Sequence, residues 1–99
     1  MTLHILSASP FATDCLAQCG QVTSAGDALL LTADGVYAVL GEHGGELQRL
    51  HAAGVRVYAL TEDCRARGID GRLPAFVGTV DYGGFVDLAA EHPRSMSWF

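Results

Sequence analysis

The sequence contains no lysine, and all six positive charges among its 99 residues are arginines, set against eleven acidic residues. Without lysine the chain cannot form a Schiff base, anchor pyridoxal phosphate covalently or build a Walker-type phosphate loop. Its net charge of −5 argues against direct binding to nucleic acid, which requires a clustered basic face. The chemistry left to the chain is that of thiols, histidines and carboxylates.

Long hydrophobic runs are also missing. No apolar run approaches the roughly 18 residues of a membrane span, and residues 1–10 lack the basic region of a secretory signal peptide. The three cysteines, an odd number without such a signal, are expected to be reduced thiols of a cytoplasmic protein. Neither a linker nor a repeat interrupts the sequence, so we expect residues 1–99 to form one domain.

Short apolar runs alternate with helix-like segments along the chain. The predicted strands are 3–7, 28–32, 36–40, 55–60 and 76–80, with a final strand or a packed tail at 95–99. The predicted helices are 10–24, 46–53, 62–67 and 82–92, separated in the middle by a glycine-rich turn at 41–45. Asp81 is expected to cap the last helix. This alternation predicts a small α/β domain with a mainly parallel sheet of about five strands and helices on both faces, as in flavodoxin-like folds.

Two cysteines lie one turn apart in the first predicted helix. Cys15 and Cys19 share a face with apolar residues. This setting favours burial in the core, because free cysteine is among the most buried residue types. Two such ligands do not make a zinc site, and no further pair of cysteines or histidines completes one. We therefore expect no metal and no cofactor.

The third cysteine has a different setting. Cys64 stands in the first turn of the helix that follows strand 55–60, where free amides and the carboxyl edge of a parallel sheet favour a thiolate. The adjacent Glu62 and Asp63 oppose a second negative charge. From the residues alone Cys64 is the stronger nucleophile candidate, and an inward-facing core residue is the alternative.

The four histidines, at positions 4, 43, 51 and 92, form no ligand pair by spacing. A solvated or capping role is expected of each, and a histidine near a helix C-terminus, as His92 is, interacts favourably with the helix dipole. The adjacent Trp98 and Phe99 would expose a large apolar area. They predict a packed tail or a contact with another subunit.

Several short stretches, in order along nearly the whole chain, resemble the DsrH/TusB family of small sulfur-relay subunits. They are Leu3-His4, Ser9-Pro10-Phe11, Asp34-Gly35-Val36-Tyr37, Val57-Tyr58-Ala59-Leu60, Asp63 with Ala66-Arg67-Gly68, Asp81-Tyr82 with Phe85-Val86, and His92-Pro93 before Trp98. Each stretch alone is a weak signal. Their common order and spacing carry the resemblance.

The resemblance implies a DsrEFH-like fold and assembly with DsrE/TusD-like and DsrF/TusC-like subunits into a heterohexamer. Such a complex accepts persulfide sulfur from a TusA-like carrier and passes it to a TusE/DsrC-like acceptor. In the Tus branch the sulfur becomes the 2-thio group of wobble uridine in tRNA, and in the Dsr branch it serves sulfur oxidation. For this chain we expect the tRNA branch, and a DsrH-like role in sulfur oxidation is the alternative.

The resemblance also changes which of the three cysteines is the strongest candidate for a reactive thiol. DsrH-type members carry a cysteine in the first helix, and Cys19 aligns with it when counted from Ser9-Pro10-Phe11. Cys15 and Cys64 fall where relatives often have apolar residues. Many TusB-type members lack the helix cysteine, and the principal sulfur carrier belongs to the DsrE/TusD-like subunit. We therefore predict Cys19 as a persulfide carrier in an accessory subunit of a sulfurtransferase complex, with a non-catalytic structural subunit as the alternative.

Overall fold

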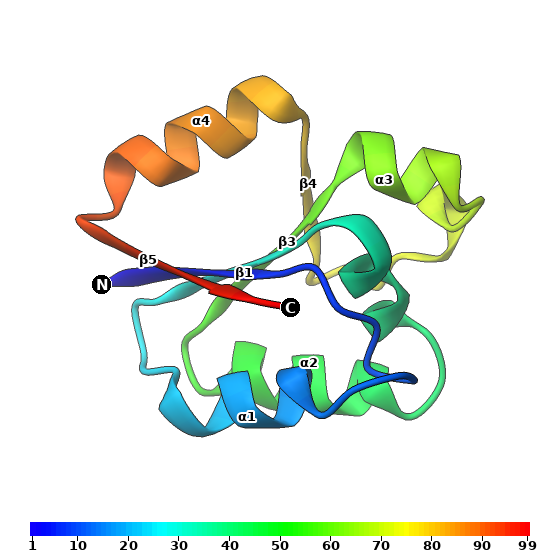
Figure 1. Cartoon of the computed structure of the whole chain (residues 1–99), viewed down its shortest axis with the longest axis horizontal. Helices are drawn as coiled ribbons and strands as arrows, with labels where there is room; N and C mark the ends of the chain where they lie inside the picture. Colours follow the sequence, from blue (N-terminus) through cyan, green and yellow to red (C-terminus); the bar gives the residue numbers. More distant parts are fainter.

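Strands and helices alternate along the chain in the computed structural model, which describes all 99 residues (Figure 1). The elements are, in chain order, β1 (Thr2–Leu6), α1 (Cys15–Val22), β2 (Ala28–Leu31), the 3₁₀ helix η1 (Ala33–Val39), α2 (His43–Ala52), β3 (Arg56–Leu60), α3 (Thr61–Ala66), the 3₁₀ helix η2 (Asp70–Arg72), β4 (Gly78–Val80), α4 (Tyr82–Glu91) and β5 (Arg94–Trp98). None of these helices combines the length and the apolarity that crossing a membrane requires.

All five strands run parallel in one sheet, in the order β4-β3-β2-β1-β5. The central strand, β2, has the sequence Ala-Leu-Leu-Leu and is completely buried. A central strand of a parallel sheet is covered on both faces, and it therefore forms from a continuous apolar run rather than an alternating one. The α/β class and the parallel sheet predicted from the sequence are confirmed.

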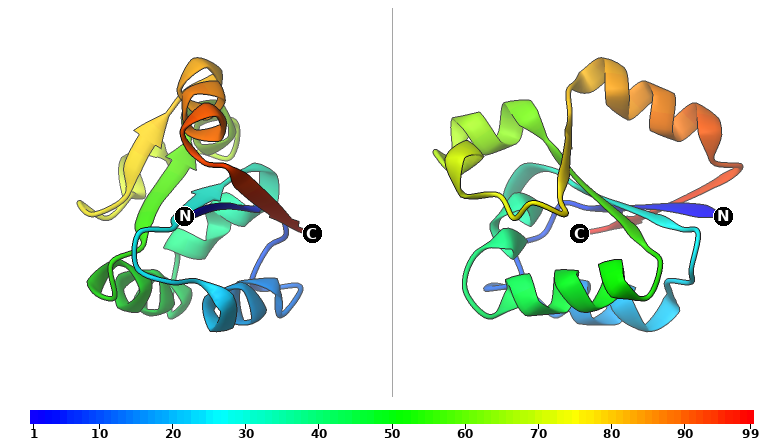
Figure 2. Two further views of the ribbon diagram at one scale, coloured as in Figure 1. Left: turned by 90° about the vertical axis from the view of Figure 1, so that its left-hand side faces the viewer. Right: turned by 180° about the vertical axis from the view of Figure 1, so that it is seen from behind.

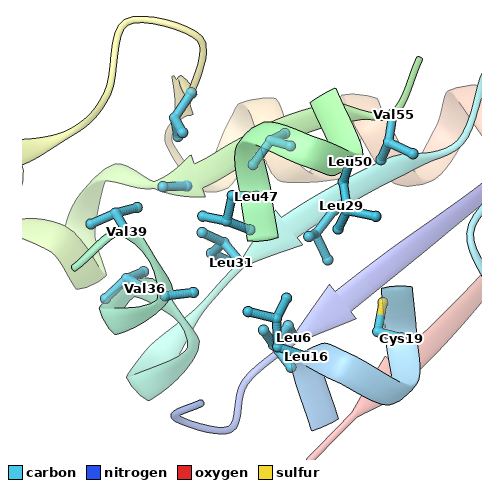
Figure 3. Close-up of a cluster of buried hydrophobic side chains, with 14 of the residues drawn as sticks. Leu6, Leu16, Cys19, Leu29, Leu31, Val36, Val39, Leu47, Leu50 and Val55 are labelled. Carbon is cyan, nitrogen blue, oxygen red and sulfur yellow. The ribbon is translucent and has the colours of Figure 1, made fainter. Parts of the chain in front are cut away.

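The two faces of the sheet are covered unequally. Helices α1 and α2 lie along one face and α4 along the other (Figures 1 and 2). Between the sheet and helices α1 and α2 lies a cluster of 16 buried residues, which includes Leu6, Leu31 and Leu47 (Figure 3). The cluster under α4 has only four buried residues, Leu3, Ala28, Leu30 and Leu88. Most of the core therefore lies on the α1–α2 side.

The predicted strand at 36–40 is wrong. These residues belong mostly to η1, in which Val36, Ala38 and Val39 are buried. The apolar run therefore reports burial without the backbone geometry of a strand. Gly35 allows η1 to pass close to the end of β1, because a Cβ atom at this position would stand 2.0 Å from the carbonyl oxygen of Leu6.

Two helix starts also differ from the prediction. Helix α1 begins at Cys15 rather than at residue 10, because residues 9–13 form a separate turn in which the Thr13 amide donates to the Ser9 carbonyl at 3.0 Å. Helix α2 begins at His43, so it takes up part of the stretch predicted as a turn. The cap at Asp81 is as expected, since its carboxylate accepts a hydrogen bond from the Gly84 amide at 2.8 Å.

The sequence leaves residues 95–99 as either a final strand or a packed tail, and the structure shows a strand. β5 pairs with β1 along its whole length, with Thr2 opposite Arg94 and Leu6 opposite Trp98. Phe99 follows the strand and is 86% exposed. The tail is thus part of the sheet, and it forms one of the two sheet edges.

A pair of glycine substitutions tests the contact between η1 and β1. Gly35→Ala is expected to lower the free energy of unfolding by about 3 kcal/mol, because the added methyl group overlaps backbone that cannot move freely. Gly45→Ala, in helix α2 with no atom within 4 Å of the new methyl group, is expected to raise it by roughly 0.5–1 kcal/mol. Urea denaturation measures both values, and equal effects of the two substitutions would contradict the close approach.

Candidate functional site

The three cysteines are free thiols at different depths. Cys19 is 0% and Cys64 1% exposed, whereas Cys15 is only partly buried. Since thiol chemistry requires access to a thiolate, depth and charge decide which of the three can react.

Cys19 projects from α1 into the large core cluster, near Leu6 and Leu16 (Figure 3). Burial raises the pKa of the Cys19 thiol to about 12, and the negative charge of Asp27 and the neighbouring Cys15 add to the increase. A thiol in this state is protonated at neutral pH and is closed to solvent. Before the Cys19 sulfur can attack a donor persulfide, α1 therefore has to open locally from this conformation.

Cys64 projects from α3 into the same cluster. Burial raises the pKa of its thiol, Asp63 and Asp70 raise it further, and only Arg67 opposes them. The helix start that the sequence suggested as an activating feature is therefore outweighed by desolvation and by nearby carboxylates. The geometry corresponds to the inward-facing alternative.

Cys15 is the first residue of α1 and packs only partly against the core. Its amide donates a hydrogen bond to the Thr13 hydroxyl at 3.3 Å. Of the three thiols it is the one that solvent reaches most easily, although the sequence predicts Cys15 to be a buried core residue.

A buried polar network joins the two ends of the chain, and the sequence did not reveal it. His4 lies on β1 and is 1% exposed, so the solvated or capping role expected of it is wrong. Its Nε2 lies 3.1 Å from Oδ2 of Asp27, and its Nδ1 accepts a hydrogen bond from the Trp98 indole at 3.3 Å. This pattern requires a neutral ring with its proton on Nε2. The only available signals were an aspartate just before an apolar strand and a histidine within one.

Asp27 is the centre of this network. Burial raises the pKa of its carboxyl, but hydrogen bonds from the amides of Thr2 and Ser24 and from His4 outweigh burial and hold the pKa below its usual value. The two amide hydrogen bonds are 2.9 and 3.0 Å long. Asp27 is therefore a structural anion whose ionised form stabilises the fold.

The other histidines lie apart from this network. His92 is buried and caps α4, as predicted: its Nδ1 lies 2.7 Å from the Leu88 carbonyl oxygen, and its Nε2 lies 3.2 Å from an Arg56 guanidinium nitrogen. His43 packs edge-on against Phe11 with ring centroids 4.7 Å apart, and His51 stacks on Phe76 at 5.0 Å. No two histidines meet at a common site.

Two of the family-like stretches meet at the carboxyl ends of β2 and β3. Arg67 donates to the Asp34 carboxylate at 3.1 Å, and its guanidinium lies 6.0 Å from the centre of the Tyr37 ring. Asp63 accepts a 2.6 Å hydrogen bond from the amide of Ala33, which has a left-handed φ of 47°. These charges satisfy one another, so the cluster holds η1 in place rather than presenting a free group to a ligand.

A pocket of about 290 Å³ lies between the turn after β1, helix α1 and the start of α2. Asp14, Glu42, Glu46 and His43 give it a polar and mainly acidic lining, and no cysteine lines it. The structure places no three metal-ligating side chains together. The pocket and the thiols are therefore separate features of the molecule.

The geometry defines a class of protein: a small α/β domain with an all-parallel five-stranded sheet and two deeply buried thiols. Solved structures share this fold. The ychN protein from Escherichia coli superposes with a TM-score of 0.77 at 17% identity, over 98% of this chain and 97% of that one. The protein MTH1491 from Methanobacterium thermoautotrophicum superposes with a TM-score of 0.72 at 22% identity, over 97% and 96%.

Sequence comparison is more specific. The family described as DsrH like protein matches residues 8–95. Protein TusB of Escherichia coli K12 is 42% identical over 96 residues, which are 97% of this chain and 99% of that protein. Protein TusB of Pectobacterium parmentieri is 41% identical over 97 residues, with the same coverage. The chain belongs to the DsrH/TusB family, as the stretches in its sequence predicted.

Thiol labelling tests the depths of the three cysteines. In the folded protein, iodoacetamide is expected to modify Cys15 at least about a hundredfold faster than Cys19 or Cys64, because the two buried thiols react only during local opening. Tandem mass spectrometry measures the rates, because Cys15 and Cys19 share the tryptic peptide 1–49 and only its fragmentation assigns the label to one of them; labelling in urea serves as the control in which all three react. Fast native labelling of Cys19 would contradict the buried position.

Acid titration tests the anchor at Asp27. Because its pKa is lower in the folded chain than in the unfolded one, its contribution is complete above about pH 4 and is lost as pH falls through the folded pKa. Asp27→Asn is expected to cost about 2 kcal/mol at pH 7 and to lose less stability than the natural protein on acidification. Urea denaturation between pH 7 and pH 2 measures both, with Asp70→Asn at an exposed site as the control. Parallel pH curves for Asp27→Asn and the natural protein would contradict the anchor.

Proposed function

We propose that this chain is a subunit of a TusBCD-type sulfur-relay complex, which moves persulfide sulfur toward the 2-thio group of wobble uridine in tRNA. The observation that carries the proposal is the 42% identity to Protein TusB over nearly the full length of both chains. In this role the chain acts in the cytoplasm as an accessory subunit of a sulfurtransferase complex.

The proposed partners are protein subunits rather than tRNA. They are a DsrE/TusD-like and a DsrF/TusC-like subunit, while a TusA-like donor and a TusE/DsrC-like acceptor meet the assembled complex. A net charge of −5 without any lysine supports this arrangement, because contact with a phosphate backbone depends on basic residues. The tRNA is then modified by a later component of the relay.

Within the complex, two roles for Cys19 make opposite demands. As a carrier, its thiolate attacks the outer sulfur of a donor persulfide, so that a new S–S bond forms at Cys19 and the donor leaves as a thiolate. That step needs a deprotonated and accessible sulfur, whereas burial raises the pKa of Cys19 to about 12. The geometry therefore favours the structural subunit, in which the reactive cysteine lies on a companion. Cys19 as a carrier remains a prediction that requires α1 to open in the complex.

The sulfur-oxidation branch has one feature in its favour. A cysteine in the first helix is typical of DsrH-type members, and Cys19 occupies this position. The identity to Protein TusB supports the tRNA branch instead. Deletion of the gene separates the two: loss of 2-thiouridine from tRNA supports thiolation, whereas unchanged 2-thiouridine together with loss of sulfur oxidation supports the DsrH-like role.

A matched pair of cysteine variants tests the role of Cys19 in the reconstituted complex. We expect Cys19→Ser and Cys64→Ser to transfer sulfur within about twofold of the natural complex, since neither thiol is placed to form a thiolate. Transfer is measured with a persulfide donor and isotopically labelled sulfur, and the label is located by mass spectrometry. Label on Cys19, or a loss of transfer that is specific to Cys19→Ser, would establish the carrier role instead.

A further inference from the structure

The outer side of α4 is apolar although it faces solvent in the isolated chain. Tyr82 is 58% and Val86 67% exposed, and these residues lie one turn apart on the helix. Ala89 and Ala90 are exposed on the same side. We call Tyr82, Val86, Ala89 and Ala90 the α4 outer face. Because Leu88 is also apolar and points inward, α4 has apolar residues on both sides, which is the pattern of a buried helix.

The layer beneath α4 is also incomplete. The hydrophobic cluster on this face of the sheet contains only four buried residues, against 16 in the cluster on the opposite side. Ile5, Tyr58, Val80 and Phe85 remain partly exposed around them. Parallel sheets are normally covered on both faces, and a single ten-residue helix does not achieve this here (Figure 2).

The charges around the α4 outer face show what kind of surface fits it. Asp81 precedes the helix, Asp87 and Glu91 lie on one flank, and all three are exposed. The helix contains no basic residue. An antiparallel contact between α4 helices of two copies would place these acidic flanks side by side. A complementary partner instead presents an apolar patch with arginine or lysine at its rim.

We propose that the α4 outer face docks a companion subunit of the sulfur-relay complex through an apolar patch rimmed by basic side chains. The inference rests on the proposed function and adds the surface and the chemistry of the contact. Val86 lies at the centre of the apolar contact, and Asp87 and Glu91 pair with the basic rim. A single exposed apolar residue such as Val22, 52% exposed on α1 across the sheet, lacks such a setting.

Substitutions at matched sites test this surface. The chain is purified alone, its DsrE-like and DsrF-like companions are co-expressed and purified separately, and the affinity between the two preparations is measured by calorimetry. Val86→Asp is expected to weaken binding at least about tenfold, whereas Val22→Asp leaves it unchanged. Glu91→Arg is expected to weaken binding and to reduce its salt dependence, whereas Asp70→Arg, at an exposed site away from α4, does neither. Thermal unfolding of each isolated variant confirms that the fold is intact.

The outcomes separate this inference from the proposed function. Natural affinity of Val86→Asp would overturn the docking surface, even where the complex still supports 2-thiouridine. A stable homodimer of the chain alone that Val86→Asp dissociates would also overturn it, in favour of a second copy on this face. Conversely, weaker binding of Val86→Asp in a complex that supports no tRNA thiolation would uphold the surface and overturn the proposed function.

Discussion

The ionised carboxylate of Asp27 is the interaction on which the arrangement of the sheet depends. It accepts hydrogen bonds from the amides of Thr2 and Ser24 and from the ring of His4, which in turn accepts one from Trp98. A buried carboxylate without these partners would cost several kcal/mol, so the segments that supply the hydrogen bonds have to stay in contact with Asp27. The first strand, the connection into β2 and the last strand, 94 residues away from His4, are thereby held in one register.

This register has a consequence for the opposite face. Because β5 adds beside β1, while β4 lies at the other edge, the chain has to cross the whole width of the sheet between its last two strands. The ten residues of α4 make this crossing alone (Figure 1). On the other face, α1 connects β1 to β2 and α2 connects β2 to β3, and each of these pairs of strands is adjacent in the sheet. The thin layer under α4 is therefore set by the topology and not by a shortage of apolar residues, and it leaves a surface suited to another subunit.

The sequence predicts those features that depend on local pattern. The apolar run of β2, the mostly apolar stretch of β3 and the cap at Asp81 each form as expected, since propensity and burial agree there. The run at 36–40 misleads because 3₁₀ and extended backbones can bury similar side chains, and the deciding contact, Gly35 against Leu6, is made between elements far apart in sequence. The pairing of His4 with Asp27 is hidden for the same reason. Membership of the DsrH/TusB family was predictable because many weak stretches keep their order and spacing.

The absence of lysine bears on where reactive sulfur can lie in the proposed complex. A persulfide-carrying thiolate is stabilised by a nearby cation or by an open helix start. Here Cys19 lies near the carboxylate of Asp27, and Cys64 near those of Asp63 and Asp70. The one cation that lowers the pKa of Cys64, Arg67, is already paired with Asp34. Since both thiols are buried among anions, any cation that activates sulfur has to come from another subunit. Such a cation is a separate demand on the companion subunits, because the α4 outer face lies across the sheet from the core cluster that holds both thiols, and a partner docked on α4 does not reach that cluster (Figure 1).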